Sequence, residues 1–138
     1  KLDWPGKTGE EYLAYEFWSG TFLGPMKQLD VELPAMSCRV YAVRRAVGRP
    51  QVLSTDRHVT GGAVDILAEK WDPAARRLSG RSRLVRGWPH RMVLHVPNGF
   101  EARGVSAGGV KPESEAKGEL LILRFTPTAD EVDWSVSF

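Results

Sequence analysis

VDWSVSF, residues 132–138, ends the chain with a strict alternation of apolar and polar side chains. Successive side chains of a β-strand point to opposite faces of the sheet, so a period of two is typical of a half-buried strand. The alternation continues to the last residue of the sequence, which predicts a core strand there. We expect this strand to be the closing piece of a larger protein.

Strand signals recur along the rest of the chain. Residues 29–33 and 91–96 repeat the alternation, and residues 38–43, 64–71 and 120–125 have the aliphatic and aromatic composition of strands. Turns rich in glycine and proline separate these runs at intervals of roughly eight to fifteen residues. The sequence therefore predicts an all-β fold, a two-sheet antiparallel β-sandwich of the Greek-key or jelly-roll kind.

Two segments do not read as strands. Residues 73–78 are the best helix candidate, but they make barely one helical turn, and an Asp-Pro turn before a strand explains them equally well. Residues 108–118 are rich in glycine and charge, and we expect them to form a solvated hairpin loop. No boundary divides the chain, so we expect one domain over residues 12–138.

Length and composition fit a soluble globular domain. A chain of 138 residues, 42% hydrophobic and 26% charged, can bury a core of its own. Its longest apolar runs are far shorter than the roughly twenty residues that cross a bilayer, so we expect no membrane partner. The lone cysteine, Cys38, is expected to be a small core residue in a strand. The first residue is Lys1 rather than methionine, and we expect the native N-terminus to lie elsewhere.

The charge distribution does not favour nucleic-acid binding. The net charge is only +2, although six arginines occur between residues 76 and 91. Alternation places Arg77, Arg81 and Arg83 on the solvent side of one strand. The basic and aromatic residues do not interleave as they do on single-strand binding surfaces. We therefore expect no nucleic-acid partner.

The histidines do not have the spacing of a catalytic or zinc site. His58, His90 and His95 are too widely separated for the short two-histidine patterns that bind zinc, and His95 is expected on the polar side of its strand. Ser54, Asp56 and His58 contain the residue types of a catalytic triad, but triad members come from separate parts of a fold. A polar turn is the preferred interpretation of that segment.

The carboxylates give no catalytic pair either. Asp30 and Glu32 are expected on one solvent-facing strand edge, whereas a glycosidase needs two carboxylates facing each other across a cleft. We predict no catalytic residue, no metal and no cofactor. A calcium ion among Asp56, Asp65 and Asp72 stays open, with turn formation as the alternative role of these aspartates.

Aromatic residues are the better candidates for a binding role. Tyr12, Trp18 and Phe22 belong to a segment with bulky side chains on both faces, which predicts either a domain interface or packing at the edges of the same core. Trp71 and Trp88 lie at or next to turns, where an exposed indole ring stacks on a sugar; core or edge packing is the alternative.

Four segments resemble a known family. YLAYEFW (12–18), LDVELPAMSCRVYAVR (29–44), PQVLST (50–55) and RHVT (57–60) are similar to the C-terminal β-sandwich domain of bacterial alpha-galactosidase-like glycoside hydrolases. The resemblance implies a (β/α)8 barrel ahead of this domain, with residues 1–11 as the linker. It also implies an exported protein, secreted or periplasmic.

The resemblance carries no catalytic residue to this chain. In that family two aspartates of the barrel hydrolyse the glycosidic bond, and no part of this sequence matches their motifs. It implies a non-catalytic accessory domain that packs on the barrel and stabilises it. The alternatives are a carbohydrate-binding module that uses Trp71 or Trp88, and a small independent hydrolase. One departure from the family pattern, at residues 61–63, leaves the role of that loop open.

Overall fold

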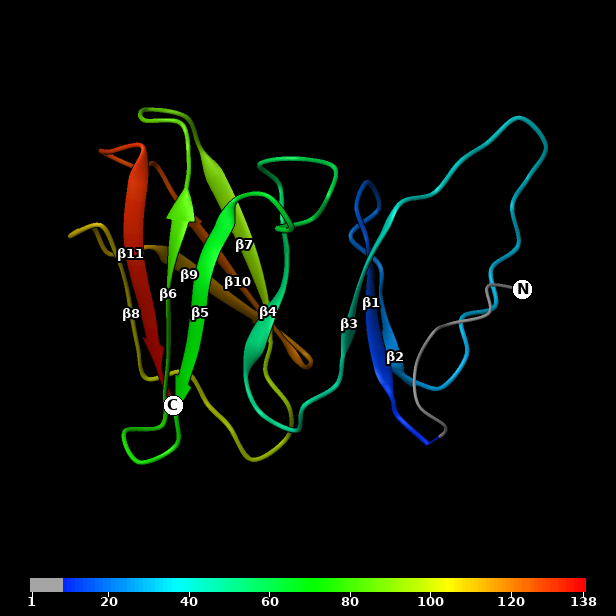
Figure 1. Cartoon of the computed structure of the whole chain (residues 1–138), viewed down its shortest axis with the longest axis horizontal. Coiled ribbons are helices and arrows are strands. Elements are labelled where there is room, and N and C mark those ends of the chain that lie inside the picture. The colour runs from blue at the N-terminus through cyan, green and yellow to red at the C-terminus, as the bar shows by residue number, and fades with distance from the viewer. Residues whose placement is uncertain (1–8) are drawn as a thin grey trace.

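The computed structural model describes residues 9–138, and within that range the chain forms strands, turns and loops without a helix (Figure 1). The predicted linker, residues 1–11, therefore lies largely outside the described residues. The strands are β1 (Tyr12–Glu16), β2 (Phe22–Met26), β3 (Tyr41–Arg45), β4 (Gln51–Thr55), β5 (Ile66–Asp72), β6 (Arg77–Arg83), β7 (His90–His95), β8 (Gly104–Ala107), β9 (Glu113–Lys117), β10 (Leu120–Phe125) and β11 (Glu131–Ser137). The all-β prediction is confirmed.

The strands form three antiparallel sheets. Sheet A has the order β2-β1-β3, sheet B the order β4-β7-β10-β9, and sheet C the order β5-β6-β11-β8. Sheets B and C enclose the larger core, and sheet A packs on the other face of sheet B through a smaller core (Figure 1). The predicted two-sheet sandwich corresponds to sheets B and C, and sheet A adds a third layer.

The closing strand β11 lies inside sheet C, paired with β6 on one side and β8 on the other. Val132, Trp134 and Val136 point into the larger core, as their alternation predicts. The Trp134 indole donates a hydrogen bond of 2.9 Å to the hydroxyl of Ser82. Its ring covers Gly80, where a Cβ atom would overlap the ring, so that position has to be glycine.

Strand β7 explains why sheet B is the middle layer. Met92 and Leu94 point into the larger core, whereas Val93 points into the smaller core under sheet A. His95 lies on the same side as Val93 and is buried, so the prediction of a surface histidine is wrong. Sheet A covers the face on which His95 was expected to meet solvent, because residues before β4 form a separate layer.

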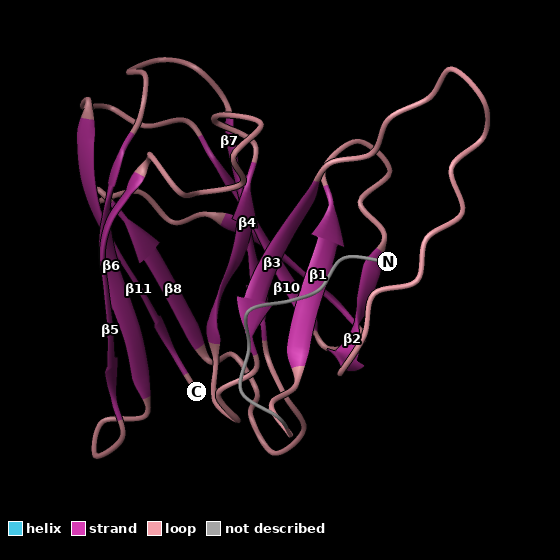
Figure 2. Cartoon of the chain, turned by 45° about the vertical axis from the view of Figure 1, so that its right-hand side comes forward, coloured by secondary structure: helices cyan, strands magenta, loops and turns pink. Residues whose placement is uncertain are grey.

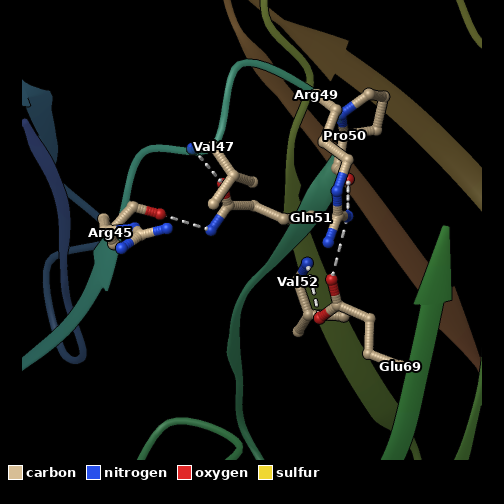
Figure 3. Close-up of polar contacts among 7 residues, drawn as sticks. All are labelled: Arg45, Val47, Arg49, Pro50, Gln51, Val52 and Glu69. Atoms are coloured by element: carbon tan, nitrogen blue, oxygen red, sulfur yellow. Dashed lines mark hydrogen bonds and ion pairs between the residues drawn. The ribbon is translucent and has the colours of Figure 1, made fainter.

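Polar side chains join the three sheets where β3, β4 and β5 approach one another (Figure 3). The buried Gln51 donates to the Arg45 carbonyl at 3.0 Å and accepts from the Val47 amide at 3.2 Å. Glu69 accepts a hydrogen bond of 3.3 Å from the Val52 amide. The chain therefore passes from sheet A to sheet B through a hydrogen-bonded turn, and a side chain of sheet C satisfies the edge of β4.

Residues 27–40 form a long loop between β2 and β3, so the predicted strand at residues 29–33 is wrong. The loop extends away from the sheets in both views (Figures 1 and 2). Within residues 9–138, its alternating side chains have no adjacent strand to pair with and belong to neither core. Asp30 and Glu32 therefore lie on this loop. Cys38 is exposed on it, which corrects the expectation of a core cysteine.

Two turn predictions had different outcomes. Residues 73–76 form a turn, as expected, in which the Asp72 carboxylate accepts hydrogen bonds from the Ala74 and Ala75 amides. Residues 113–117 form β9 rather than a loop, and β9 pairs with β10 at the edge of sheet B. Its side chains are all exposed, so its sequence has the polarity of a loop. Charged residues on an edge strand discourage pairing with other chains.

Candidate functional site

Trp71 is packed at one end of the larger core. Its ring centroid lies 5.5 Å from that of Phe100 and 6.0 Å from that of Phe138. Aromatic contacts at these distances stabilise a packed cluster. Trp71 is half-buried as a result, so its ring is occupied by neighbouring side chains.

Trp88 is exposed on a rigid turn between β6 and β7. Its side chain is 71% exposed, although the backbone around it is well anchored. The Trp88 amide donates to the Val85 carbonyl at 3.1 Å, and Gly87 has a φ of 77°. This closes a four-residue turn of the type that requires glycine at its third position. The Gly87 amide also donates to the Pro127 carbonyl at 2.8 Å, which fixes the turn to the loop before β11.

Asp56 and His90 form a pair next to this turn. The His90 Nδ1 atom lies 3.2 Å from Asp56 Oδ1, and the Arg91 amide donates to the same oxygen at 2.8 Å. His90 is buried, with its ring edge-to-face against Phe125. Burial acts to raise the pKa of Asp56, but the hydrogen bonds and charges of His90 and Arg91 outweigh it and lower the pKa. Asp56 is therefore an ionised hydrogen-bond acceptor at neutral pH.

Two hollows meet at this pair. A small cavity of about 90 Å³ lies between the pair and the Trp88 turn, and a wider groove of about 630 Å³ lies on the other side. Both are lined by Asp56, Pro89 and His90. The wider groove continues past Arg91 to Lys111. The arrangement offers donors, acceptors and one exposed aromatic ring to a ligand.

The structure does not assemble Ser54, Asp56 and His58 into one site. His58 is exposed and lies 3.3 Å from the Thr60 hydroxyl, whereas Ser54 is buried in β4. Asp56 pairs with His90 instead. The sequence does not predict the Asp56–His90 pair, because the pair forms only when β4 lies next to β7. No spacing of residues along the chain indicates that these two strands are neighbours.

The predicted interface residues lie around sheet A in different environments. Trp18 is 58% exposed, in the turn between β1 and β2. Phe22 points inward and packs against the ring of His95, with 5.6 Å between centroids. The Tyr12 hydroxyl donates to the Glu10 carboxylate at 3.0 Å, and the side chain is half-buried.

The β2–β3 loop, residues 27–40, is a second candidate surface. Residues 31–39 are all exposed, including Leu33 and Met36. A hollow of about 730 Å³ lies along the loop, lined by residues from Leu29 to Leu33 together with Arg39 and Tyr41. The sequence predicts an alternating strand at residues 29–33, and that prediction gives no indication of an exposed apolar surface there. The length of the loop is the signal that points to it, since structureless loops of this length are uncommon in compact domains.

The aspartates considered for calcium serve separate local roles. Asp65 accepts a hydrogen bond of 2.7 Å from the Thr55 hydroxyl, Asp72 caps a turn, and Asp56 binds His90. Among residues 9–138, no group of three or more histidine, cysteine, aspartate or glutamate side chains could hold a metal ion. The same residues include no helix long and apolar enough to span a membrane.

Comparisons of the chain with protein-family models, with curated proteins and with solved structures found no match.

Proposed function

We propose that this chain is a non-catalytic accessory domain of an alpha-galactosidase-like glycoside hydrolase, which packs on the (β/α)8 catalytic barrel and stabilises it. The observation that carries the proposal is the exposure of apolar side chains along the β2–β3 loop, on the side of sheet A away from the sandwich core. Contiguous exposed apolar surface on a soluble protein marks interaction sites.

The tip of the loop presents these apolar side chains in a defined turn. Residues 33–36 have the sequence Leu-Pro-Ala-Met, and all four are exposed. The Ser37 hydroxyl donates to the Pro34 carbonyl at 2.6 Å and closes the turn. Met36 has a φ of 58°, which is uncommon for a residue with a side chain. The tip is therefore a shaped apolar projection, suited to a hollow on a partner.

Trp18 is a further exposed apolar side chain, in a turn that is bonded to the end of this loop. The Phe17 amide donates to the Val40 carbonyl at 2.9 Å, which joins the β1–β2 turn to the end of the β2–β3 loop. The buried Glu16 carboxylate accepts a hydrogen bond from the Ser19 amide and holds that turn. Large apolar anchors such as Trp18 supply much of the binding energy in protein interfaces.

The test is the affinity of the chain for the catalytic barrel of its parent enzyme, produced as a separate protein. Leu33→Asp and Met36→Asp should each weaken the complex at least about tenfold, because a buried charge replaces an apolar contact. Val64→Asp is the matched control, since Val64 is 56% exposed and Leu33 54%, and Val64 lies beside β5, away from this loop. The control variant should bind as the wild type does.

Two results would overturn the proposal. One is a parent protein whose coding sequence contains no such barrel. The other is a complex in which the two loop variants bind as tightly as the Val64→Asp control. Circular dichroism of each variant checks that the fold is intact, which we expect because the substituted side chains are exposed.

A further inference from the structure

We infer that the turn carrying Trp88, together with the cavity and groove at Asp56 and His90, binds a neutral saccharide. One sugar ring stacks on the Trp88 indole, and its hydroxyl groups donate to the Asp56 carboxylate. This site lies on the β6–β7 connection, at the top left of Figure 1, whereas the β2–β3 loop lies at the far right. The two surfaces are separate, so the saccharide site goes beyond the docking function and does not depend on it.

The exposure of Trp88 is held in place by the fold. Three hydrogen bonds fix its turn: Trp88 to Val85, Gly87 to Pro127, and the Arg86 amide to the Asp130 carboxylate at 3.2 Å. Exposing a large apolar ring to water is unfavourable, and these bonds hold the backbone of Trp88 at an exposed position. A ligand that stacks on the ring therefore does not have to order the turn.

Asp56 has a free acceptor beside this ring. In the described part of the chain, the contacts with His90 and with the Arg91 amide both end on Oδ1. The side chain is about one-third exposed, so Oδ2 can reach a ligand. The buried His90 ring holds the orientation of the carboxylate through its contact with Oδ1. An ionised, oriented carboxylate forms strong hydrogen bonds with hydroxyl donors.

The lining of the site carries charges of both signs. Its basic side chains are Arg57 in the small cavity and Arg91, Lys111 and Arg124 in the groove. Its acidic side chains are Asp56 and Glu113. A polyol carries both donors and acceptors and can satisfy both kinds of side chain without a net charge. The apolar face of a sugar ring matches the indole.

The dimensions fit a saccharide longer than one ring. The cavity of about 90 Å³ has the volume of about three water molecules, so it accepts a substituent such as a hydroxymethyl group. The groove of about 630 Å³ shares Asp56, Pro89 and His90 with this cavity as lining residues and has room for further rings. We therefore assign the ligand to neutral oligosaccharides.

The experiment is a titration of the full chain with neutral oligosaccharides of glucose, mannose and galactose, each up to about 10 mM. Isothermal calorimetry gives the affinity, and the Trp88 indole proton is followed by NMR. At least one neutral oligosaccharide should bind and shift the Trp88 signal. Trp88→Ala should weaken that binding at least about tenfold, and Asp56→Asn should weaken it severalfold. Trp18→Ala is the control, because Trp18 is an exposed tryptophan on sheet A, and it should bind as the wild type does.

Three results would overturn the inference: no neutral oligosaccharide binds, only charged oligomers such as hexagalacturonate or hexaglucosamine bind, or Trp88→Ala and Trp18→Ala bind equally well. Asp56→Asn also disturbs His90 and could reduce folding. Trp88→Ala removes only an exposed side chain and keeps the test valid. Failure here leaves the affinity for the barrel unchanged, so it is distinguishable from failure of the docking proposal.

Discussion

Burial lowers the pKa of His95, although the Glu119 carboxylate 3.7 Å away favours the charged form. Its ring lies against Phe22 in the smaller core, and neither ring nitrogen has a hydrogen-bond partner among residues 9–138. A proton on His95 would place a charge between sheets A and B. The neutral form is therefore the one that the packing of these sheets requires.

The pH dependence of stability follows from this. Because the pKa of His95 is lower in the folded than in the unfolded state, the unfolded chain takes up the proton more readily. The stabilisation is present above the unfolded pKa, about 6.5, and is lost as the pH falls through it toward the folded pKa. Urea unfolding between about pH 8 and pH 5 should show this loss in the wild type and a smaller one in His95→Phe. His58→Phe, at an exposed position, should keep the wild-type slope. Equal slopes in all three proteins would contradict the account.

At the scale of elements, Gln51 attaches sheet A to the sandwich. Its side chain is buried and bonds the Arg45 carbonyl and the Val47 amide on the turn that connects the two layers (Figure 3). Gln51→Ala should lower the free energy of unfolding by about 1–3 kcal/mol, since it leaves backbone groups unsatisfied. Gln28→Ala removes an exposed side chain that donates to the Asp30 carboxylate, and it should change the free energy of unfolding by less than about 0.5 kcal/mol. Chemical denaturation measures both, and a larger loss in Gln28→Ala would contradict the role of Gln51.

The elements also show what the sequence could and could not predict. The alternation in β11 depends on local side-chain chemistry, and it correctly predicts the strand and its core face. The same alternation at residues 29–33 gives a wrong strand prediction, because alternation shows only which side chains could share a face of a strand. It does not record whether a neighbouring strand is present. His95 was misplaced for the converse reason, since a third layer covers the face that two sheets would leave to solvent.

In the candidate sites too, features encoded by the local sequence could be predicted, whereas features that depend on neighbouring strands could not. Trp88 was identified as a possible contact because its turn is encoded locally by Gly87 and Pro89. The Asp56–His90 pair beside it was not, because it forms only when β4 lies next to β7. Trp71 has the same local signals as Trp88, but it packs against Phe100 and Phe138 from distant segments. Tertiary contacts, and not the local sequence, therefore determine which tryptophan is packed and which is exposed.

At the scale of the whole molecule, the chain has three layers, with an exposed apolar loop beside sheet A and a polar groove near the β6–β7 connection. The loop has the exposure of an interface, and the groove has the mixed polarity of a ligand site. An accessory domain that docks through sheet A would keep the groove accessible, because the β6–β7 connection lies away from the β2–β3 loop (Figure 1).

Hydrogen exchange of the chain with and without the proposed catalytic barrel, produced as a separate protein, tests the central claim most directly. Backbone amides exchange slowly once an interface excludes water and orders them. The account predicts that the barrel slows exchange at residues 31–39 and in the β1–β2 turn around Trp18, with little change in β9 and on the outer face of sheet C. Protection confined to β9 or sheet C, with residues 31–39 unchanged, would contradict it.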